Sequence, residues 1–527
     1  MEALHVYDTT LRDGAQQEGL NLSVSDKLAI AGLLDDLGVD FIEGGWPGAN
    51  PKDTEFFERA RTELHLRHAT LAAFGATRRA GSSAAEDPLV AALLDARTSV
   101  VCLVAKSHVR HVEEALRTTL EENLEMVRDT VSHLVAAGKR VFLDAEHFFD
   151  GWHLDRGYAL AVVGAAHEAG AEVIVLCDTN GGMLPHVIEE VVADVIAETG
   201  ARVGAHCHND TGCAVANSIA AVRAGATHVQ GTVNGYGERT GNADLVTVAA
   251  NLEFKLGLDV MARDSFRRAM HVAHAISEVT NVPAYSRQPY VGASAFAHKA
   301  GLHASALKVD PALYQHMEPE LVGNGMRTLV SDMAGRASIE LKAKEAGLDL
   351  SGRPDIVVDV LARVKDLEQR GWTFDAADAT VELMVRQALE PGCARYFSVE
   401  SWRVMTDSTA TGDAVSEATV KLHADGARHL ATGEGNGPVN ALDHALREAL
   451  AKAYPEIEKL ELIDYKVRIL DASHGTDAVT RVLIETSDGE TSWDTIGVAG
   501  SILAASWRAL TDGLAYGLIR QGVAPRP

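Results

Sequence analysis

Two histidines near the end of one apolar run have the spacing of a metal site. His206 and His208 lie in the segment ARVGAHCHND. Residues two apart on a strand point to the same face, so both imidazoles can reach one metal ion while Cys207 points the opposite way. Imidazole binds several divalent metals, and a metal site with open positions acts as a Lewis acid. The alternative is a pair of strand-end histidines that only form hydrogen bonds.

The segment DTTLRDG, at the end of the first apolar run, adds carboxylates and a guanidinium. It contains Asp8, Arg12 and Asp13. A carboxylate from this strand end can complete a site with the histidine pair if the sheet closes on itself. Arg12 then supplies a fixed charge and a planar fork for an anionic substrate and its developing oxyanion. The alternative is a structural ion pair between Arg12 and Asp8.

Other polar residues follow further apolar runs. Glu146 in DAEHFF and Thr179 in CDTNGG are a carboxylate and a hydroxyl that can position a substrate and share in proton transfer. The loop GYGERTGN, residues 235–242, has glycines for a tight turn but lacks the lysine of a phosphate-binding loop. His298 and His303, in AFAHKAGLH, fit no strand, and they are either loop histidines or residues that reach over the site. Each residue alone is an ordinary polar cap, and only the combination favours a site.

The elements that must position these residues are short apolar runs that alternate with helix-length segments. Such alternation predicts parallel strands with right-handed helical crossovers. Eight runs favour a closed (β/α)₈ TIM barrel over the competing doubly wound sheet, and the polar residues then lie at its carboxyl-terminal mouth. The predicted strands are LHVYDTT, VDFIEGG, TLAAFG, SVVCLVAKS, VFLDAEH, EVIVLCDTN, ARVGAHCHND and HVQGTVNGYGER.

Beyond a barrel domain of residues 1–260, the chain changes character twice. Residues 261–390 are predicted to form helical linker subdomains, with helices in MARDSFRRAMHVAHAISEVTN, ASIELKAKEAG and DIVVDVLARVKDLEQRG. Residues 391–527 hold two copies of a unit of three strands and a helix, which predicts an α+β domain with an internal pseudo-repeat. Apolar residues line one face of the first helix of this domain, at Val439, Leu442, Leu446 and Leu450.

Composition excludes several classes of partner. The formal net charge is −26, which repels nucleic acid and anionic membranes. The five cysteines are odd in number and show no C-x-x-C spacing, which indicates reduced thiols. No signal peptide and no apolar run long enough to span a bilayer is visible. We therefore expect a cytoplasmic protein that binds neither nucleic acid nor membrane.

Seven motifs occur in an ordered set along essentially the whole chain: DTTLRDGAQQEG, DAEHFFDG, LCDTNGG, HCHND, NGYGERTGN, FAHKAGLHASA and GEGNGPVNAL. The set resembles the family of 2-isopropylmalate, homocitrate and citramalate synthases, which is related to the lyases that cleave hydroxymethylglutaryl-CoA. The wording of FIEGGWPGANPKD and DAEHFFDGW is most similar to citramalate synthases that carry a regulatory domain.

The resemblance implies roles for residues at the barrel mouth. Asp13, His206 and His208 match the metal ligands of the family, and Asn242 matches a further amide ligand. Arg12 matches the arginine that binds and polarises a 2-oxo acid. The implied cofactor is a divalent metal ion, Mn²⁺, Mg²⁺ or Zn²⁺.

The resemblance also implies roles outside the metal site. Glu146 and Thr179 match substrate-site residues, and His303 matches a catalytic histidine of the linker region. Tyr314 is the candidate for its tyrosine partner, although spacing in this region varies within the family. In the family these linker residues often reach the neighbouring subunit, which implies a homodimer.

The substrate pocket departs from the family pattern. Asp144 stands where some family members have an aromatic residue, two positions before the glutamate of the fifth strand. Phe74 and Leu103, on the third and fourth strands, are candidate pocket walls. The departure therefore concerns the substrate pocket and not the metal site.

The implied reaction is the condensation of acetyl-CoA with pyruvate to give (R)-citramalate and CoA, a step toward isoleucine. The closest alternative is a 2-isopropylmalate synthase acting on 2-oxoisovalerate, toward leucine. A lyase running the reverse cleavage is a further alternative, but lyases of the family generally lack the duplicated C-terminal unit. A non-catalytic amino-acid sensor is the alternative from another class. The C-terminal unit implies feedback inhibition by isoleucine or leucine.

Overall fold

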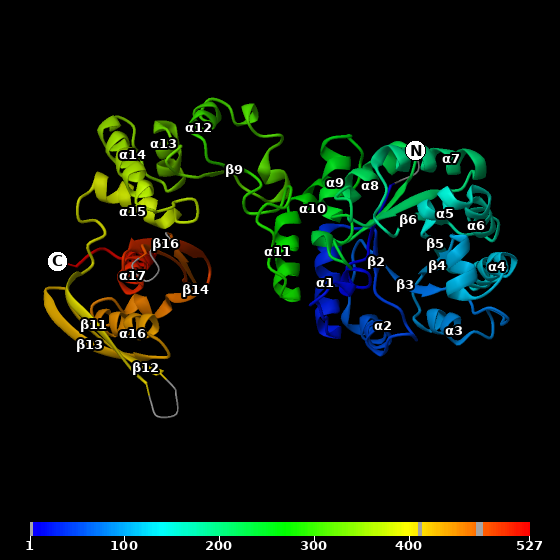
Figure 1. Cartoon of the computed structure of the whole chain (residues 1–527), viewed down its shortest axis with the longest axis horizontal. Helices are drawn as coiled ribbons and strands as arrows, with labels where there is room; N and C mark the ends of the chain where they lie inside the picture. The colour runs from blue at the N-terminus through cyan, green and yellow to red at the C-terminus, as the bar shows by residue number, and fades with distance from the viewer. Residues whose placement is uncertain (1–3, 409–413, 471–477, 527) are drawn as a thin grey trace. The chain divides into compact units, whose positions relative to one another are not determined.

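Eight parallel strands close into a barrel in sequence order (Figure 1). The first strand is hydrogen-bonded to both the second and the eighth. The computed structural model describes residues 4–408, 414–470 and 478–526. Each strand falls on one of the eight apolar runs, so the predicted TIM barrel is confirmed and the open sheet is wrong. The strands are β1 (His5–Asp8), β2 (Phe41–Glu43), β3 (Thr70–Ala76), β4 (Val100–Lys106), β5 (Arg140–Glu146), β6 (Val173–Asp178), β7 (Val203–Cys207) and β8 (His228–Gly231).

Helices between the strands cover the outside of the barrel. Helix α1 (Val24–Leu37) begins after Ser23, which forms a capping box with Asp26, and it is followed by Gly38 in the left-handed region at φ 88°. This cover buries the strands on both faces, which explains why the runs are almost continuously apolar. The other helices are α2 (Pro51–Glu63), α3 (Pro88–Asp95), α4 (Leu120–Ala136), α5 (Phe148–Leu154), α6 (Arg156–Glu168), α7 (Pro185–Thr199), α8 (Ala214–Arg223) and α9 (Leu245–Phe254).

The lower part of the barrel interior is a layer of rings. The rings of Phe41 and Phe142 are 5.1 Å apart, and the ring of His228 lies 5.2 Å from that of Phe142. His5 lies beside this layer, with its ring 5.7 Å from that of His228. The barrel is therefore filled beneath the mouth, and the chemistry is confined to one end.

A polar layer lies directly above the rings. Side chains two residues apart on a strand share a face, so each ring on β2, β5 and β8 is followed on the inside by a polar residue. These residues are Glu43, Asp144 and Gln230, which are 0%, 4% and 1% exposed. This layer is the floor of the barrel mouth.

The described chain divides into two compact units. The first comprises Met1–Phe296 and Pro319–Gly325, and the second comprises Ala297–Glu318 and Met326–Pro527. The helix expected over 261–281 is split into α10 (Arg263–Phe266) and α11 (Ala269–Thr280). The break allows the Phe266 ring to pack against that of Phe254 at 5.0 Å while α11 packs on α1. The first unit therefore extends beyond residue 260.

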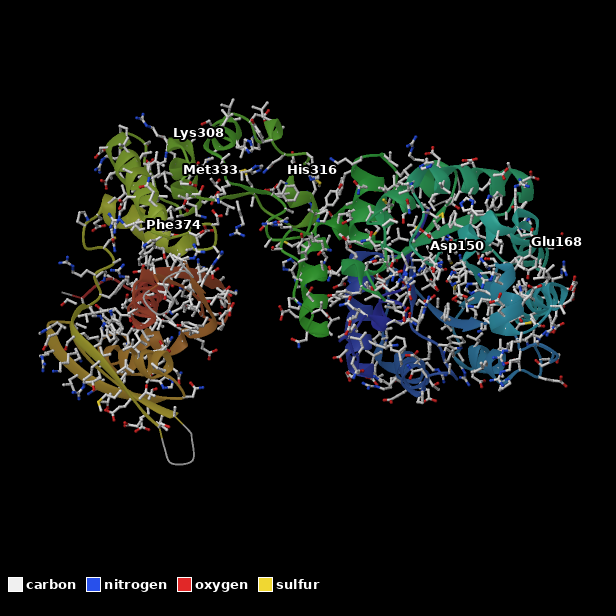
Figure 2. The ribbon with its side chains drawn as sticks, in the orientation of Figure 1. Asp150, Glu168, Lys308, His316, Met333 and Phe374 are labelled. Atoms are coloured by element: carbon white, nitrogen blue, oxygen red, sulfur yellow. The ribbon has the colours of Figure 1, made fainter. Side chains whose placement is uncertain are left out.

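The second unit begins with a helical segment. The expected helices are present as α13 (Arg336–Glu345) and α14 (Pro354–Gln369), and two further helices are α12 (Gly301–Leu307) and α15 (Asp378–Leu389). Phe374, labelled in Figure 2, is fully buried in an apolar cluster of this segment. Short strands β9 (Ala297–His298) and β10 (Arg327–Thr328) pair in parallel.

The C-terminal region contains the same unit twice. Each copy is a three-stranded antiparallel sheet followed by one helix, so the predicted α+β pseudo-repeat is confirmed. Helix α16 buries Leu442, Leu446 and Leu450 as its spacing predicts. The copies are β11 (Ser398–Ser408), β12 (Ala414–Ala424), β13 (Ala427–Gly435) and α16 (Pro438–Leu450), then β14 (Glu461–Ile469), β15 (Thr480–Ser487), β16 (Ser492–Ala499) and α17 (Ile502–Arg520).

Two global features agree with the composition. Among the described residues no helix has both the length and the apolar character needed to cross a bilayer. All five cysteines are free thiols.

The buried histidines of the ring layer predict acid sensitivity. Neither ring nitrogen of His228 has a partner among the described residues, and burial lowers the pKa of His228 well below its ordinary value. Burial and the Arg202 charge lower the pKa of His5 to about 4. Both imidazoles protonate near pH 6.5 once unfolded, so stability is complete above about pH 6.5 and is lost as the pH falls toward 4.

We expect the melting temperature to fall as the pH is lowered from about 7 to about 5, and to fall less in His228→Phe. Below about pH 6.5, each histidine that stays neutral in the folded protein lowers the free energy of unfolding by about 1.4 kcal/mol per pH unit. Thermal melting at several pH values measures this. The control is His186→Gln, because His186 is exposed. Parallel pH profiles for His228→Phe and the parent would contradict the prediction.

Candidate metal and substrate site at the barrel mouth

Asp13, His206 and His208 converge at the barrel mouth. Asp13 Oδ2 lies 3.1 Å from His206 Nε2 and 3.7 Å from His208 Nε2, and the two nitrogens are 3.3 Å apart. All three side chains are buried. Barrel closure causes this convergence, because β8 pairs with both β1 and β7 and brings their ends together. In the part of the chain that the structure describes, these residues form one of two groups whose His, Cys, Asp or Glu atoms could share a metal ion.

Asn242 joins this cluster from the loop after β8. It bridges to His208 through the backbone, and its Nδ2 donates to the Tyr236 carbonyl at 3.0 Å. The loop folds back so tightly that a Cβ at Gly241 would lie 1.9 Å from the Gly235 carbonyl oxygen, and Gly241 has φ 87°. Only glycine fits there, which explains the glycine pattern of GYGERTGN.

The donor set fits a divalent metal ion. Asp13 Oδ2 and Asn242 Oδ1 are buried without a hydrogen-bond partner among the described residues. Burial opposes ionisation of Asp13, but the Arg12 charge, with the His206 imidazole 3.1 Å away, outweighs it and holds the pKa of Asp13 below its ordinary value. Burial lowers the pKa of His208 to about 4, whereas at His206 the Asp13 carboxylate outweighs burial and raises the pKa. A carboxylate and neutral imidazoles are the forms that bind metals.

Arg12 is held by a clamp that sequence reasoning missed. Its Nε donates to Glu43 Oε1 at 2.5 Å, and the Tyr7 hydroxyl donates to the other Glu43 oxygen at 2.7 Å. The guanidinium carbon lies 3.8 Å above the Phe74 ring, and Nη1 is 3.3 Å from Asp13. Glu43 closes the run VDFIEGG, so a carboxylate at the end of a strand was the available signal. The alternative ion pair between Arg12 and Asp8 is wrong, because Asp8 accepts from the Thr10 backbone and hydroxyl instead.

A cavity of about 670 Å³ opens above the cluster. Phe74 forms one of its walls, as predicted. Leu103 does not line it, and the prediction of Leu103 as a wall is corrected: the side chain is fully buried on the opposite face of β4 from Cys102 and Val104, and Val104 lines the cavity. Alternation along the strand is the reason.

Glu146 and Thr179 also line the cavity. Glu146 pairs with Lys106 from the neighbouring strand, a cation that sequence reasoning did not single out. The Thr179 hydroxyl accepts from the His147 backbone at 2.8 Å, and the Thr179 carbonyl accepts from Arg239 at 2.8 Å. The structure thus places seven predicted site residues around one cavity, whereas Leu103 and Asn242 do not line it; the seven are Arg12, Asp13, Phe74, Glu146, Thr179, His206 and His208.

His303 and Tyr314 belong to the second compact unit. Their rings lie 4.2 Å apart and nearly parallel, at an interplanar angle of 30°. Leu302 and Val309 beside them are 76% and 82% exposed. The two predicted partners therefore contact one another, and their role in catalysis stays a prediction.

The site combines a carboxylate, two imidazoles and a buried arginine at the carboxyl end of a closed (β/α)₈ barrel. This combination defines a barrel enzyme of the metal-dependent class. Three family models match successive parts of the chain. An HMGL-like model matches residues 3–276, a homocitrate synthase post-HMGL domain-like model matches 290–371, and a LeuA allosteric (dimerisation) domain model matches 375–518.

Similar proteins match over nearly the whole length. An (R)-citramalate synthase of Streptomyces coelicolor is 64% identical over 99% of this chain and 98% of its own length, and one of Aquifex aeolicus is 47% identical over 98% of each. A probable 2-isopropylmalate synthase of Methanopyrus kandleri is 32% identical over 97% of this chain and 98% of its own. The chain belongs to the (R)-citramalate synthase family.

The clamp on Arg12 can be tested by replacing Glu43 with glutamine. Removing one charge of a buried pair typically costs about 3–5 kcal/mol, so Glu43→Gln should melt at a clearly lower temperature. It should also lower kcat/KM for the oxo acid by about 100-fold, since the fork is no longer held. Glu63→Gln is the control, because its pair with Arg59 is exposed and should matter little. An active Glu43→Gln enzyme with parental melting would contradict the clamp.

Proposed function

We propose that the chain condenses acetyl-CoA with pyruvate to give (R)-citramalate and CoA, toward isoleucine. Membership of the family makes it a transferase that uses an acyl-CoA. One observation carries the proposal: the Arg12 guanidinium, fixed by Glu43, lies against the Asp13 and histidine cluster at the base of a cavity. A chelating, anionic 2-oxo acid suits that combination of a fixed fork and a metal site. Free thiols support a reducing, cytoplasmic setting.

The metal would be held by Asp13, His206, His208 and Asn242, and Mn²⁺, Mg²⁺ and Zn²⁺ are the candidates. When bound, such an ion acts as a Lewis acid toward the keto and carboxylate oxygens of the oxo acid. Arg12 binds the same anion and stabilises the alkoxide that develops on the keto oxygen. Thr179 and Glu146, on the cavity wall, orient the substrate and its hydroxyl product.

Proton transfer is assigned to the histidine of the linker. A base removes a proton from the methyl group of acetyl-CoA, and the enolate carbon attacks the ketone carbon of pyruvate. We assign His303, stacked on Tyr314, as the proton-transfer partner. Water then cleaves the thioester and releases CoA, which makes the sequence irreversible.

The wall of the cavity beside Arg12 is aromatic. Arg12 and Phe74 are in face contact at 3.8 Å, and the Trp46 ring packs edge-on against Phe74 at 5.4 Å. A 2-isopropylmalate synthase must accept an isopropyl group, and an extra methyl or two changes binding by only about 1–3 kcal/mol. The 2-isopropylmalate activity is therefore kept as the second candidate, and it is the less supported one.

The C-terminal domain is assigned to regulation and dimerisation. An open cavity of about 1030 Å³ lies in the pseudo-repeat, lined by Val439, Leu462 and Ile502 together with charged residues. Apolar walls with a few charged groups suit a small amino acid. We propose isoleucine as the inhibitor, with leucine as the alternative, and a homodimer as the assembly. A pure sensor is disfavoured because it needs no arginine clamp at a barrel mouth.

Release of free thiol with alternative oxo acids tests the substrate. We expect kcat/KM for pyruvate to exceed that for 2-oxobutyrate and 2-oxoisovalerate, with chelator abolishing all turnover and added metal restoring it. His208→Ala should stay inactive after metal is added back. Preference for 2-oxoisovalerate would favour the second candidate, and full activity of His208→Ala would refute the site.

Mixed subunits test whether His303 serves the site of a partner subunit. His208→Ala and His303→Ala should each be inactive alone. Refolded or co-expressed together, they should recover roughly a quarter of parental activity. About half of the dimers are then mixed, and in a mixed dimer one site carries both substitutions while the other site carries neither. Recovery is measured as thiol release, and its absence in verified mixed dimers would place His303 in its own subunit's site.

A further inference from the structure

Three buried side chains link the far wall of the barrel to the metal cluster. Gln230 Oε1 and His206 Nδ1 are hydrogen-bonded at 2.8 Å, and Gln230 Nε2 donates to Asp144 Oδ1 at 2.9 Å. Gln230 is the cross-strand neighbour of His206 on β8, whereas Asp144 comes from β5. The relay therefore crosses the barrel interior, and two of its members, Gln230 and Asp144, lie outside the residues assigned to metal or substrate above.

The donor and acceptor order in this relay decides which ring nitrogen of His206 is unprotonated. A glutamine amide presents either an acceptor or a donor, depending on how it is turned. Asp144 Oδ1 accepts, so it binds the NH₂ group of Gln230 and turns the Oε1 toward His206. The His206 proton must then be on Nδ1, which leaves the Nε2 lone pair facing Asp13 and His208.

We propose that Asp144 is a positioning residue that sets, through Gln230, the tautomer and ring orientation of His206. The inference rests on the proposed function, since the tautomer matters because His206 binds a metal. It gives a role to the carboxylate that stands where some family members have an aromatic residue. It also explains a buried carboxylate that no cation contacts directly among the described residues.

The relay needs an acceptor and not a charge. The Cys102 thiol donates to the same Asp144 oxygen at 3.3 Å, so Oδ1 receives two donors. An oxygen that accepts twice keeps this role whether or not the other oxygen carries a proton. An asparagine at this position retains such an oxygen, whereas an apolar residue does not.

The affinity of the metal-free protein for Mn²⁺, measured by calorimetry, tests the inference without relying on turnover. Asp144→Leu should raise the Kd by about 10- to 100-fold, the usual effect of losing an outer partner of a metal-bound histidine. Asp144→Asn should stay close to the parent, because it keeps the acceptor. Gln230→Leu, which removes the link but keeps Asp144, should show the same loss as Asp144→Leu.

A rescue separates positioning from packing. A glutamate at position 230 can only accept when ionised, so it should fix the proton on His206 Nδ1 without help from Asp144. The double variant Asp144→Leu, Gln230→Glu should therefore recover most of the Mn²⁺ affinity. Cys102→Ala is the matched control, because it removes the other contact of Asp144 and leaves the relay intact.

The outcomes are distinct. Parental affinity in Asp144→Leu and Gln230→Leu, or no recovery in a folded double variant, overturns the inference and leaves the proposed function standing. Equal loss in Asp144→Asn and Asp144→Leu also overturns it, because the charge would then matter and not the acceptor. A parent enzyme that binds neither Mn²⁺ nor Zn²⁺ overturns the proposed function, and the inference with it.

Discussion

Arg12 carries a full charge in a place that water hardly reaches, and much of the barrel mouth is arranged around that charge. Burying a guanidinium is costly unless its donors are matched by acceptors in good geometry. Glu43 supplies the closest match and Asp13 the next, while Phe74 covers the flat face. Glu43 is itself held by the Tyr7 hydroxyl, so the clamp is rooted in the first two strands. These contacts fix one orientation of the fork before any substrate arrives, and this preorganisation is what electrostatic catalysis requires.

The same strands contribute residues to the packed barrel interior and to the polar layer of the mouth, and these residues lie two positions apart along each strand. On β2, β5 and β8 an inward ring is followed two residues later by an inward polar group. The ring layer seals the barrel from below, so the polar layer has a low-dielectric floor. Hydrogen bonds in such a setting are strong when satisfied and costly when not, which favours a single arrangement of Glu43, Asp144 and Gln230.

The sequence allowed the convergence of Asp13, His206 and His208 to be predicted better than the groups that orient them. Asp13, His206 and His208 follow apolar runs, and the count of eight runs implies that their strand ends meet. Glu43 and Gln230 were missed because their partners come from other strands, and no local pattern pairs residues across a barrel. Leu103 was misplaced for a related reason. A strand buried on both faces shows no apolar and polar alternation, so nothing in SVVCLVAKS tells which residues face inward. Helix α15 was missed because the residue before it, Ala377, has no side chain that could cap the helix and mark its start.

Charge balance at the mouth bears on the order of binding under the proposed function. Arg12 is surrounded by the carboxylates that hold it, so the side chains alone offer an incoming anion little net attraction. Asp13 and the two histidines would hold a divalent ion that makes the local sign positive, whereas distant surface charge is screened within about 8–10 Å at physiological salt. Binding of the oxo acid before the metal would place a carboxylate against Asp13 and Glu43 without compensation. The geometry therefore favours a resident metal that is loaded first, with Arg12 as the second point of attachment.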